Sequence, residues 1–303
     1  MVNPKATTTT RWGRDVLVRA LGSEMDLQLA YTRHRGHGTQ LARDAAAAGV
    51  ELVVTLGGDG TVNEVVNGLL PTGDSAATRP ALAVVPGGST NVFARALGLP
   101  KDPTESTGQI LEALREKRYR TVGLGRADER YFTFCAGMGL DAEVVRRVEY
   151  ARRQGNVSNP LLYLRSTVGP FFIRTNRRNP PVMLECPGEP AEVGLATVIV
   201  QNTAPWTYLG NRPVNPCPDA SFETGLDLLA MRVLHLPSTL RTVSQLVSRN
   251  PDPHGKRVLR RHDLASFSLS AERPMAFQLD GEYLCEREKV QFVAVPDALR
   301  VVC

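Results

Sequence analysis

Apolar residues follow two different spacings along this chain, and the change comes near residue 120. Before it, apolar residues at helical spacing alternate with short runs that are apolar throughout. The helical spacing predicts helices over 16–21, 41–48 and 62–69, and a further helix from about Thr90. Extended segments are predicted over 27–31, 52–56 and 81–85. Alternation of this kind is typical of a parallel sheet with helices on its faces.

After residue 120 the apolar runs are short and extended, and loops rich in proline, glycine and asparagine separate them. Strands are predicted over 119–124, 131–135, 193–201, 226–233, 264–270, 275–279 and 290–295. Helices are predicted over 141–154, 160–173 and 238–248. The pattern therefore predicts an α/β domain followed by a β-rich domain, and a cleft between two domains is the default place for a ligand.

The predicted strands at 52–56 and 81–85 both end in glycine-rich turns that lead into helices. The first turn is Gly57-Gly58-Asp59-Gly60-Thr61, and the second is Pro86-Gly87-Gly88-Ser89-Thr90-Asn91. Glycine lets backbone N–H groups approach a phosphate closely, and a helix N-terminus adds partial positive charge. Because ligands bind at the carboxyl ends of parallel strands, we expect a phosphate-binding edge here, with residues 3–7 as a third loop.

Asp59 places a carboxylate inside the first turn. A carboxylate repels bare phosphate, so we expect Asp59 to act through a Mg²⁺ ion shared with the phosphates, or through a lysine or ribose partner. The alternative is a tight turn in which Asp59 only caps its helix. A P-loop is excluded because the chain has no G-x-x-x-x-G-K-[ST] motif. Residues 137–142 fit G-x-G-x-x-A but lack the acidic residue that a dinucleotide site needs further on.

The 303 residues carry a net charge of +5, and this charge is unevenly spread. Residues 146–178 hold eight arginines and one acid, 241–262 has a net charge of +5, and the rest of the chain is at −7. Such stretches are either solvated helix faces or surfaces that attract nucleotide phosphates or anionic lipid. Nucleic acid is disfavoured because aromatic residues make up only 6% of the chain and no nucleic-acid motif is present. An apolar face with flanking arginines at 161–173 fits either a membrane interface or core packing.

The cellular compartment can also be inferred from the sequence. No apolar run approaches the roughly 18 residues that span a bilayer, and residues 1–4 lack the layout of a signal peptide. The five cysteines include no C-x-x-C pair, which argues against a disulfide framework or a zinc site. We therefore expect a protein of a reducing compartment that does not cross a membrane.

Three motifs in order carry a family resemblance: residues 57–65, residues 86–91 with 93–95, and Asp280-Gly281-Glu282. Over nearly the whole chain the sequence resembles the diacylglycerol kinase catalytic-domain family, and most closely its bacterial soluble lipid kinases of actinobacterial type. The resemblance implies an α/β nucleotide-binding domain of the NAD kinase and diacylglycerol kinase type, residues 1–120 completed by 297–303. It implies a C-terminal β-sandwich domain for the lipid, residues 121–296, and ATP-dependent phosphorylation of a lipid hydroxyl with Mg²⁺.

The resemblance also implies roles for individual residues. Catalytic roles are expected of Asp280, as general base, and of Glu282 and Asp59. Nucleotide contacts are expected from Asn3, Gly57, Gly58, Asp59, Gly60, Thr61, Glu64, Gly87, Gly88, Thr90 and Asn91. Metal-binding roles are expected of Asp59, Asp141, Asp219 and Asp227, the last two for a second, structural ion.

The role of Asp280 agrees with its position, because an extended segment delivers its carboxylate at a turn where it can accept a hydroxyl proton. Without the family resemblance, a plain hairpin turn would be the simpler interpretation. The sequence departs from the family pattern in three places. Only two residues precede Asn3, where a full first strand is usual; Val92 replaces an acid; and 223–227 lacks one acid of the usual metal loop.

Taken together, the sequence predicts a cytoplasmic lipid kinase that binds peripherally to the inner face of the membrane. It would convert diacylglycerol or a related lipid alcohol to phosphatidic acid or its analogue. ATP and Mg²⁺ are the expected cofactors and an anionic lipid surface is the expected partner; a homodimer is compatible with the sequence, and nucleic acid is not expected. Two alternatives stay open: a kinase of a soluble substrate that resembles NAD kinase, and a nucleotide-binding regulator without catalysis.

Overall fold

The computed structural model describes residues 1–4, 11–70, 75–153 and 180–303. The chain forms two compact units, Met1–Gly123 with Asp297–Cys303, and Leu124–Pro296. The sequence predicts the boundary between residues 120 and 121, close to this division. Strands β3 (Tyr119–Ala127) and β14 (Glu282–Val302) contribute residues to both units. The helix predicted over 160–173 and residues 5–7 of the third loop lie outside the described residues.

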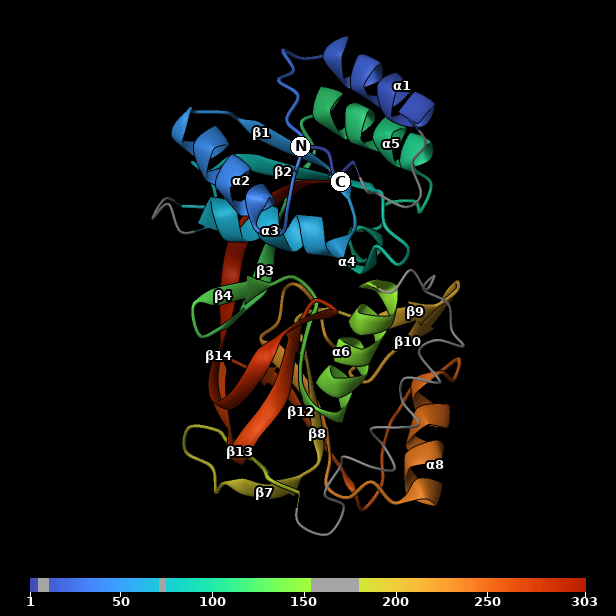
Figure 1. Cartoon of the computed structure of the whole chain (residues 1–303), viewed down its shortest axis with the longest axis vertical. Coiled ribbons are helices and arrows are strands. Elements are labelled where there is room, and N and C mark those ends of the chain that lie inside the picture. The colour runs from blue at the N-terminus through green and yellow to red at the C-terminus, as the bar shows by residue number, and fades with distance from the viewer. Residues whose placement is uncertain (5–10, 71–74, 154–179) are drawn as a thin grey trace. The chain divides into compact units, whose positions relative to one another are not determined.

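Short parallel strands form the centre of the first unit (Figure 1). β1 (Leu52–Gly57) and β2 (Ala81–Pro86) pair in parallel over their full length, so that Gly57 lies opposite Pro86. The C-terminal end of β14 joins β2, also in parallel. Both glycine-rich turns therefore begin at the same edge of this sheet, as the sequence predicts.

Val2 extends the sheet by a single residue beyond β1. It forms parallel bridges to Leu56 and to Tyr31, and the N–H of Asn3 donates to the carbonyl of Leu56 at 3.0 Å. The strand predicted over 27–31 is thus reduced to one bridge residue.

Helices cover both faces of this sheet. Their bounds are α1 (Arg11–Gly22), α2 (His37–Ala47), α3 (Asp59–Leu69), α4 (Val92–Ala96) and α5 (Pro103–Arg115). Figure 1 shows α1 and α5 on one face of β1 and β2, and α2 and α3 on the other. Helices α2 and α3 approach closely at Gly68, where a β-carbon would lie 2.4 Å from the carbonyl oxygen of Thr39. The sequence prediction missed α5, although Asp102 caps it and Pro103 occupies its first turn.

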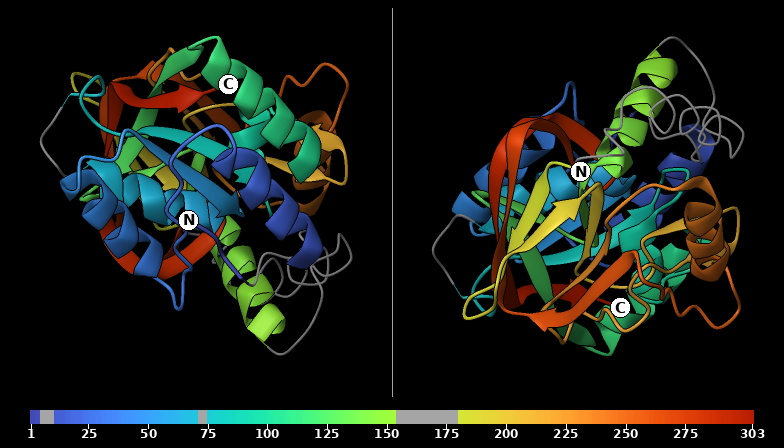
Figure 2. Two further views of the ribbon diagram at one scale, coloured as in Figure 1. Left: turned by 90° about the horizontal axis from the view of Figure 1, so that it is seen from above. Right: turned by 90° about the horizontal axis from the view of Figure 1, so that it is seen from below.

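The second unit is rich in antiparallel strands. Its further elements are β4 (Arg130–Phe132), β5 (Cys135–Gly139), α6 (Leu140–Arg153), β6 (Val182–Glu185), β7 (Glu192–Leu195), β8 (Thr197–Gln201), β9 (Thr207–Leu209), β10 (Arg212–Val214), β11 (Leu226–Met231), α8 (Leu236–Leu246), β12 (Val258–Leu264) and β13 (Ser266–Leu279). The main ladder runs β14-β13-β5-β8-β11-β12, and β9 and β10 form a separate hairpin. Figure 2 shows these strands from above and below.

One large core fills the second unit, because β13 pairs with β6 near its start and with β5 at its end. The strands thereby enclose a shared set of buried side chains that includes Met138, Val200, Phe267 and Phe292. The rings of Phe267 and Phe292 stack with centroids 4.9 Å apart. The predicted fold class, an α/β domain followed by a strand-rich domain, is confirmed. Among the helices of the described residues, none is both long and apolar enough to cross a bilayer.

Candidate functional site

The two glycine-rich turns lie side by side. The N–H of Gly87 donates to the carbonyl oxygen of Gly57 at 2.8 Å, which ties the end of β2 to the end of β1. A β-carbon on Gly88 would lie 2.7 Å from the Cα of Gly58, and one on Gly58 would lie 3.2 Å from the Cα of Gly88. Glycine at both positions is what allows this approach. We call residues 57–61 and 87–91 the glycine edge.

Asp59 joins the two halves of the glycine edge. Its Oδ1 accepts the backbone N–H of Phe93, 3.2 Å away in the first turn of α4. The N-cap of α3 is Gly58, which provides no side-chain cap, so Asp59 lies in the first turn of its helix and not at the cap position. The first N–H groups of a helix have no intrahelical acceptor, so this end of α3 can receive an anionic ligand.

Asn91 shapes the second turn. Its backbone is left-handed, with φ 51° and ψ 53°, a conformation that asparagine tolerates better than most residues. Its Oδ1 accepts the N–H of Gly88 at 2.8 Å, and its Nδ2 donates to the carbonyl of Gly88 at 2.7 Å. The buried amide of Asn91 therefore holds Gly88 in place.

Two further predicted nucleotide residues lie at the first turn but differ in what they contact. The Nδ2 of Asn3 donates to the hydroxyl of Thr61 at 3.2 Å, which brings the start of the third loop to the glycine edge. The carboxylate of Glu64 instead accepts the N–H groups of Gly36 at 2.7 Å and Gly38 at 2.9 Å. Glu64 thus caps the N-terminus of α2, a long-range contact that the local sequence does not indicate.

Asp280 lies in the two-residue turn between β13 and β14. Asp280 and Gly281 both have positive φ, 48° and 74°, as a tight hairpin turn of type I′ requires. Asp280 is 5% exposed, and its carboxylate accepts four hydrogen bonds from the turn between β4 and β5. Two come from the N–H and hydroxyl of Thr133, at 2.8 and 2.9 Å, and two from the N–H groups of Phe134 and Cys135, at 3.0 and 3.1 Å. Asp280 therefore holds the turn between β4 and β5 as well as its own.

Asp141 is buried beside this turn, in the first turn of α6. Its Oδ2 accepts Nε2 of Gln278 at 2.8 Å, and the Oε1 of Gln278 accepts the N–H of Gly281. Burial raises the pKa of Asp141 to about 7, although the hydrogen bond from Gln278 acts in the opposite direction. A β-carbon on Gly137 would lie 1.7 Å from Oδ2 of Asp141, so the carboxylate needs glycine there. Gln278 thus links Asp141 to Gly281, in the same turn as Asp280.

Glu282, the other predicted catalytic residue of this motif, begins β14. Its Oε2 lies 3.0 Å from Nη2 of Arg130, with the two side chains 21% and 34% exposed. The ion pair lies at one end of β4 and β14. Glu282 is thus paired with a cation in the structure.

The predicted metal residues Asp219 and Asp227 also have side-chain partners within the protein. Oδ2 of Asp219 lies 3.0 Å from Nη2 of Arg260. The buried Asp227 lies 2.8 Å from Nδ1 of His262, and this hydrogen bond raises the pKa of His262. Across the described ranges, no three His, Cys, Asp or Glu side chains are grouped as metal ligands. The metal roles of Asp141, Asp219 and Asp227 stay predictions.

Comparison with known proteins gives a consistent picture. A family model described as the diacylglycerol kinase catalytic domain matches residues 1–127. A probable lipid kinase, YegS-like, of Xanthomonas campestris pv. campestris (strain 8004) is 37% identical over 274 residues, which cover 88% of this chain and 82% of the relative. The matched family model includes all of the glycine edge.

Solved structures share the fold. A putative diacylglycerol kinase from Bacillus anthracis str. Sterne superimposes with a TM-score of 0.79 at 23% identity, over 99% of this chain and 94% of that one. An NAD kinase from Archaeoglobus fulgidus, in complex with ATP, gives a TM-score of 0.52 at 10% identity, over 100% and 92% of the two chains. At 23% and 10% identity, these two structures show only that the fold is shared.

Proposed function

This chain belongs to the diacylglycerol kinase family, and we propose that it transfers the terminal phosphoryl group of ATP to the hydroxyl of diacylglycerol or a related lipid alcohol. The product would be phosphatidic acid or its analogue. The observation that carries the proposal is the backbone contact between Gly58 and Gly88, which brings two glycine-rich turns into one edge.

The glycine edge fits the phosphate groups of a nucleotide. Backbone N–H groups at the start of α3 can donate to phosphate oxygens, and the helix dipole favours negative charge there. The absence of β-carbons at Gly58 and Gly88 lets the backbone lie close to a ligand. Thr61 and Asn3, which already contact each other, supply a hydroxyl and an amide at the same edge.

Asp59 is suited to share a Mg²⁺ ion with the phosphates. Mg²⁺ in kinases is commonly held by one or two carboxylates together with substrate phosphates and water, rather than by a cage of protein ligands. A carboxylate has about four lone-pair sites, so Asp59 could hold an ion while it accepts the N–H of Phe93. An ion held there would neutralise negative charge on the transferring phosphoryl group.

Asp280 is the candidate for accepting the proton of the lipid hydroxyl. General bases act within hydrogen-bond reach of the proton that they remove, and each oxygen of Asp280 already accepts two hydrogen bonds. In our proposal the substrate hydroxyl takes the place of the Thr133 hydroxyl, the one side-chain donor among the four. The three backbone donors would keep the carboxylate oriented.

The proposal places the enzyme in the cytoplasm, at the inner face of the membrane where a lipid substrate resides. Cationic stretches of the second half of the chain support this location, since anionic leaflets attract arginine and lysine. The attraction should weaken at high salt.

A lipid-panel kinase assay tests the proposal and separates it from the alternatives. The purified protein is incubated with γ-labelled ATP, Mg²⁺ and either mixed lipid vesicles or NAD. Label in a lipid product is the expected result. Label in NAD but in no lipid would favour a kinase that resembles NAD kinase, and ATP binding without transfer to either would favour a regulator.

A further inference from the structure

Helix α8 (Leu236–Leu246) presents its large aliphatic side chains to solvent. Leu236, Leu240 and Val243 are 43%, 59% and 48% exposed. At about 100° per residue, these three positions lie within an arc of about 60° on one side of the helix. They form a single stripe, which we call the α8 stripe.

The side of α8 that packs on the protein is different in character. Thr242 and Leu246 are its buried residues, and Leu246 joins a small cluster with Leu229 and Leu234. The hydroxyl of Thr242 donates to the carbonyl of Ser238 within the helix, at 3.0 Å. A helix that only packed on its own core would place threonine outside and leucine inside. Here Thr242 is buried and three aliphatic side chains lie together at the surface, which is typical of an interaction site.

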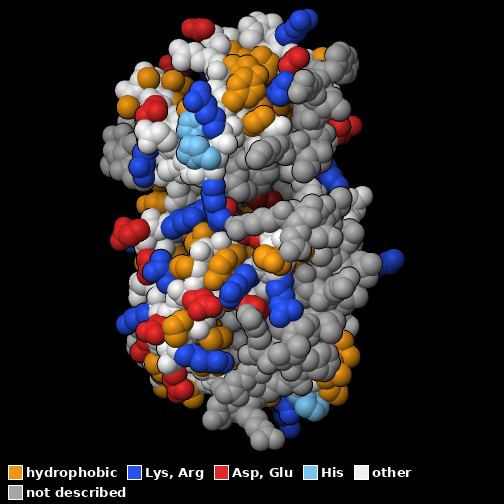
Figure 3. Space-filling view, viewed as in Figure 1, with side chains coloured by type: hydrophobic (Ala, Val, Ile, Leu, Met, Phe, Trp, Pro, Cys, Tyr) orange, Lys and Arg blue, Asp and Glu red, His pale blue; other side chains and the backbone are white. Residues whose placement is uncertain are grey.

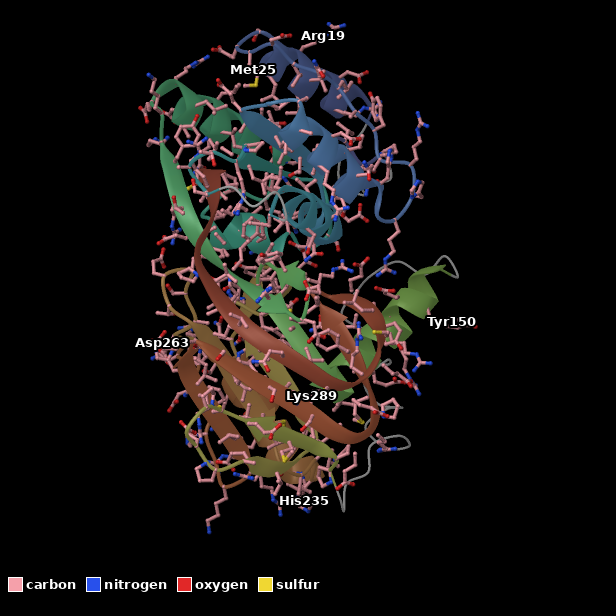
Figure 4. All side chains as sticks on the ribbon, turned by 90° about the vertical axis from the view of Figure 1, so that its left-hand side faces the viewer. Arg19, Met25, Tyr150, His235, Asp263 and Lys289 are labelled. Carbon is pink, nitrogen blue, oxygen red and sulfur yellow. The ribbon has the colours of Figure 1, made fainter. Side chains whose placement is uncertain are left out.

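Exposed cations lie on α8 and in the segment that follows it. Arg241, Arg249, Lys256 and Arg257 are all exposed, and Nη1 of Arg257 donates to the hydroxyl of Ser238 at 3.2 Å, which holds that guanidinium against the helix. Figure 4 shows His235 extending outward at the lower edge of the view. In Figure 3, hydrophobic side chains lie along the lower right margin, where Figure 1 shows α8.

Negative charge is scarce in this segment of the chain. Asp252 is the one acidic residue between positions 235 and 257. It is already engaged, with Oδ1 at 2.8 Å from Nη1 of Arg260 and Oδ2 at 3.3 Å from Nδ1 of His254. The cations listed above therefore have no local carboxylate in this segment to balance them.

We propose that the α8 stripe and its flanking cations are a docking surface for an anionic lipid bilayer. An aliphatic stripe between cationic flanks is the pattern of helices that lie in the membrane interface, where apolar side chains enter the acyl boundary and cations meet anionic headgroups. A second copy of this chain would bring the same cations into opposition, so charge complementarity favours lipid. The inference rests on the proposed function, because it supplies the surface on which a lipid kinase would meet its substrate.

Vesicle binding by the full chain, without ATP, tests this surface independently of catalysis. Sedimentation uses vesicles of phosphatidylcholine alone, or with an equal amount of phosphatidylglycerol. We expect the wild type to bind the anionic vesicles and L240S/V243S to bind them at least tenfold more weakly. The matched control is V193S, which alters an equally exposed aliphatic residue, 61% exposed, on β7 and should bind within twofold of wild type.

Tryptophan fluorescence provides a second measurement, which reports insertion into the bilayer directly and does not require a variant that has lost binding. In L240W the new indole should shift its fluorescence to the blue on anionic vesicles and be quenched by brominated lipid, whereas V193W should show neither change. Equal binding of wild type and L240S/V243S, equal binding to neutral and anionic vesicles, or an L240W signal that vesicles do not alter would each overturn the assignment. If no lipid is phosphorylated but the vesicle results hold, the kinase proposal fails and the docking surface stands.

Discussion

Gly58 and Gly88 meet through their backbones: a β-carbon added to Gly88 would lie 2.7 Å from the Cα of Gly58. The neighbour is backbone and not a flexible side chain, so neither turn can yield without moving its strand or helix. Two segments about thirty residues apart in sequence therefore form one structural feature, the glycine edge.

Replacing Gly88 by alanine should separate the two turns. We expect G88A to lower the free energy of unfolding by about 1–3 kcal/mol, the usual effect of overpacking, and to weaken ATP binding. Urea denaturation and calorimetric titration measure the two effects. The control is G108A in α5, where a β-carbon meets nothing within 4 Å and the better helix propensity should stabilise the protein by up to about 1 kcal/mol. Native ATP affinity in G88A would contradict this account.

Asp280 should be important for folding as well as for activity. In D280N the amide oxygen can keep the N–H groups of Phe134 and Cys135, while its NH₂ group faces Thr133. The Thr133 hydroxyl can turn and accept from this NH₂ group, but the N–H of Thr133 loses its acceptor. An unsatisfied buried donor costs about 1–3 kcal/mol, so we expect a loss of this size in urea denaturation. A fully stable D280N would show that these contacts do not hold the β4–β5 turn. T133V removes one side-chain donor and keeps the backbone donors, and should be affected less.

Asp141 should make stability fall as the pH rises. Burial holds its pKa at about 7 in the folded chain, whereas an unfolded aspartate titrates near 3.9. Between about pH 4 and pH 7 the folded state retains a proton that the unfolded state has lost, so the free energy of unfolding decreases, by up to about 1.4 kcal/mol per pH unit. D141N should remove this contribution. Identical pH profiles for wild type and D141N would contradict the assignment.

Metal removal should have little effect on the protein without nucleotide. Arg260 already pairs with Asp219, and His262 hydrogen-bonds to Asp227, so both carboxylates have protein partners. We expect a chelator to change the melting temperature by no more than about 1 °C. A fall of about 5 °C, which corresponds to roughly 2 kcal/mol or more for a protein of this size, would show a structural metal.

Local sequence patterns account well for the glycine edge. β1 and β2 are predicted because each is an apolar run that ends at a glycine turn, and the structure places those turns side by side. Helix α5 could also have been predicted, since Asp102 and Pro103 form a standard helix start. The contact between Gly58 and Gly88 depends on the register in which β1 pairs with β2. The hydrophobic pattern of a single strand does not predict that register.

Long-range contacts explain where the sequence prediction is wrong. The apolar run over 131–135 suggests one strand, but Asp280 binds the N–H groups of Thr133 and Phe134 and turns the chain between β4 and β5. The runs 264–270 and 275–279 suggest two strands, yet 266–270 and 275–279 belong to one strand, β13, whose pairing with β14 shifts register between them. Glu64 likewise caps α2 from 26 residues away. A distant partner decides each of these cases.

The most direct test of the central claim compares wild type with D59N in a lipid kinase assay. Asparagine can still accept the N–H of Phe93, so the fold should persist while the charge at the glycine edge is lost. With γ-labelled ATP, Mg²⁺ and diacylglycerol in anionic vesicles, the account predicts labelled phosphatidic acid from the wild type and a rate at least 100-fold lower from D59N. Absence of label in any lipid with the wild type, or equal rates for the two proteins, would contradict it.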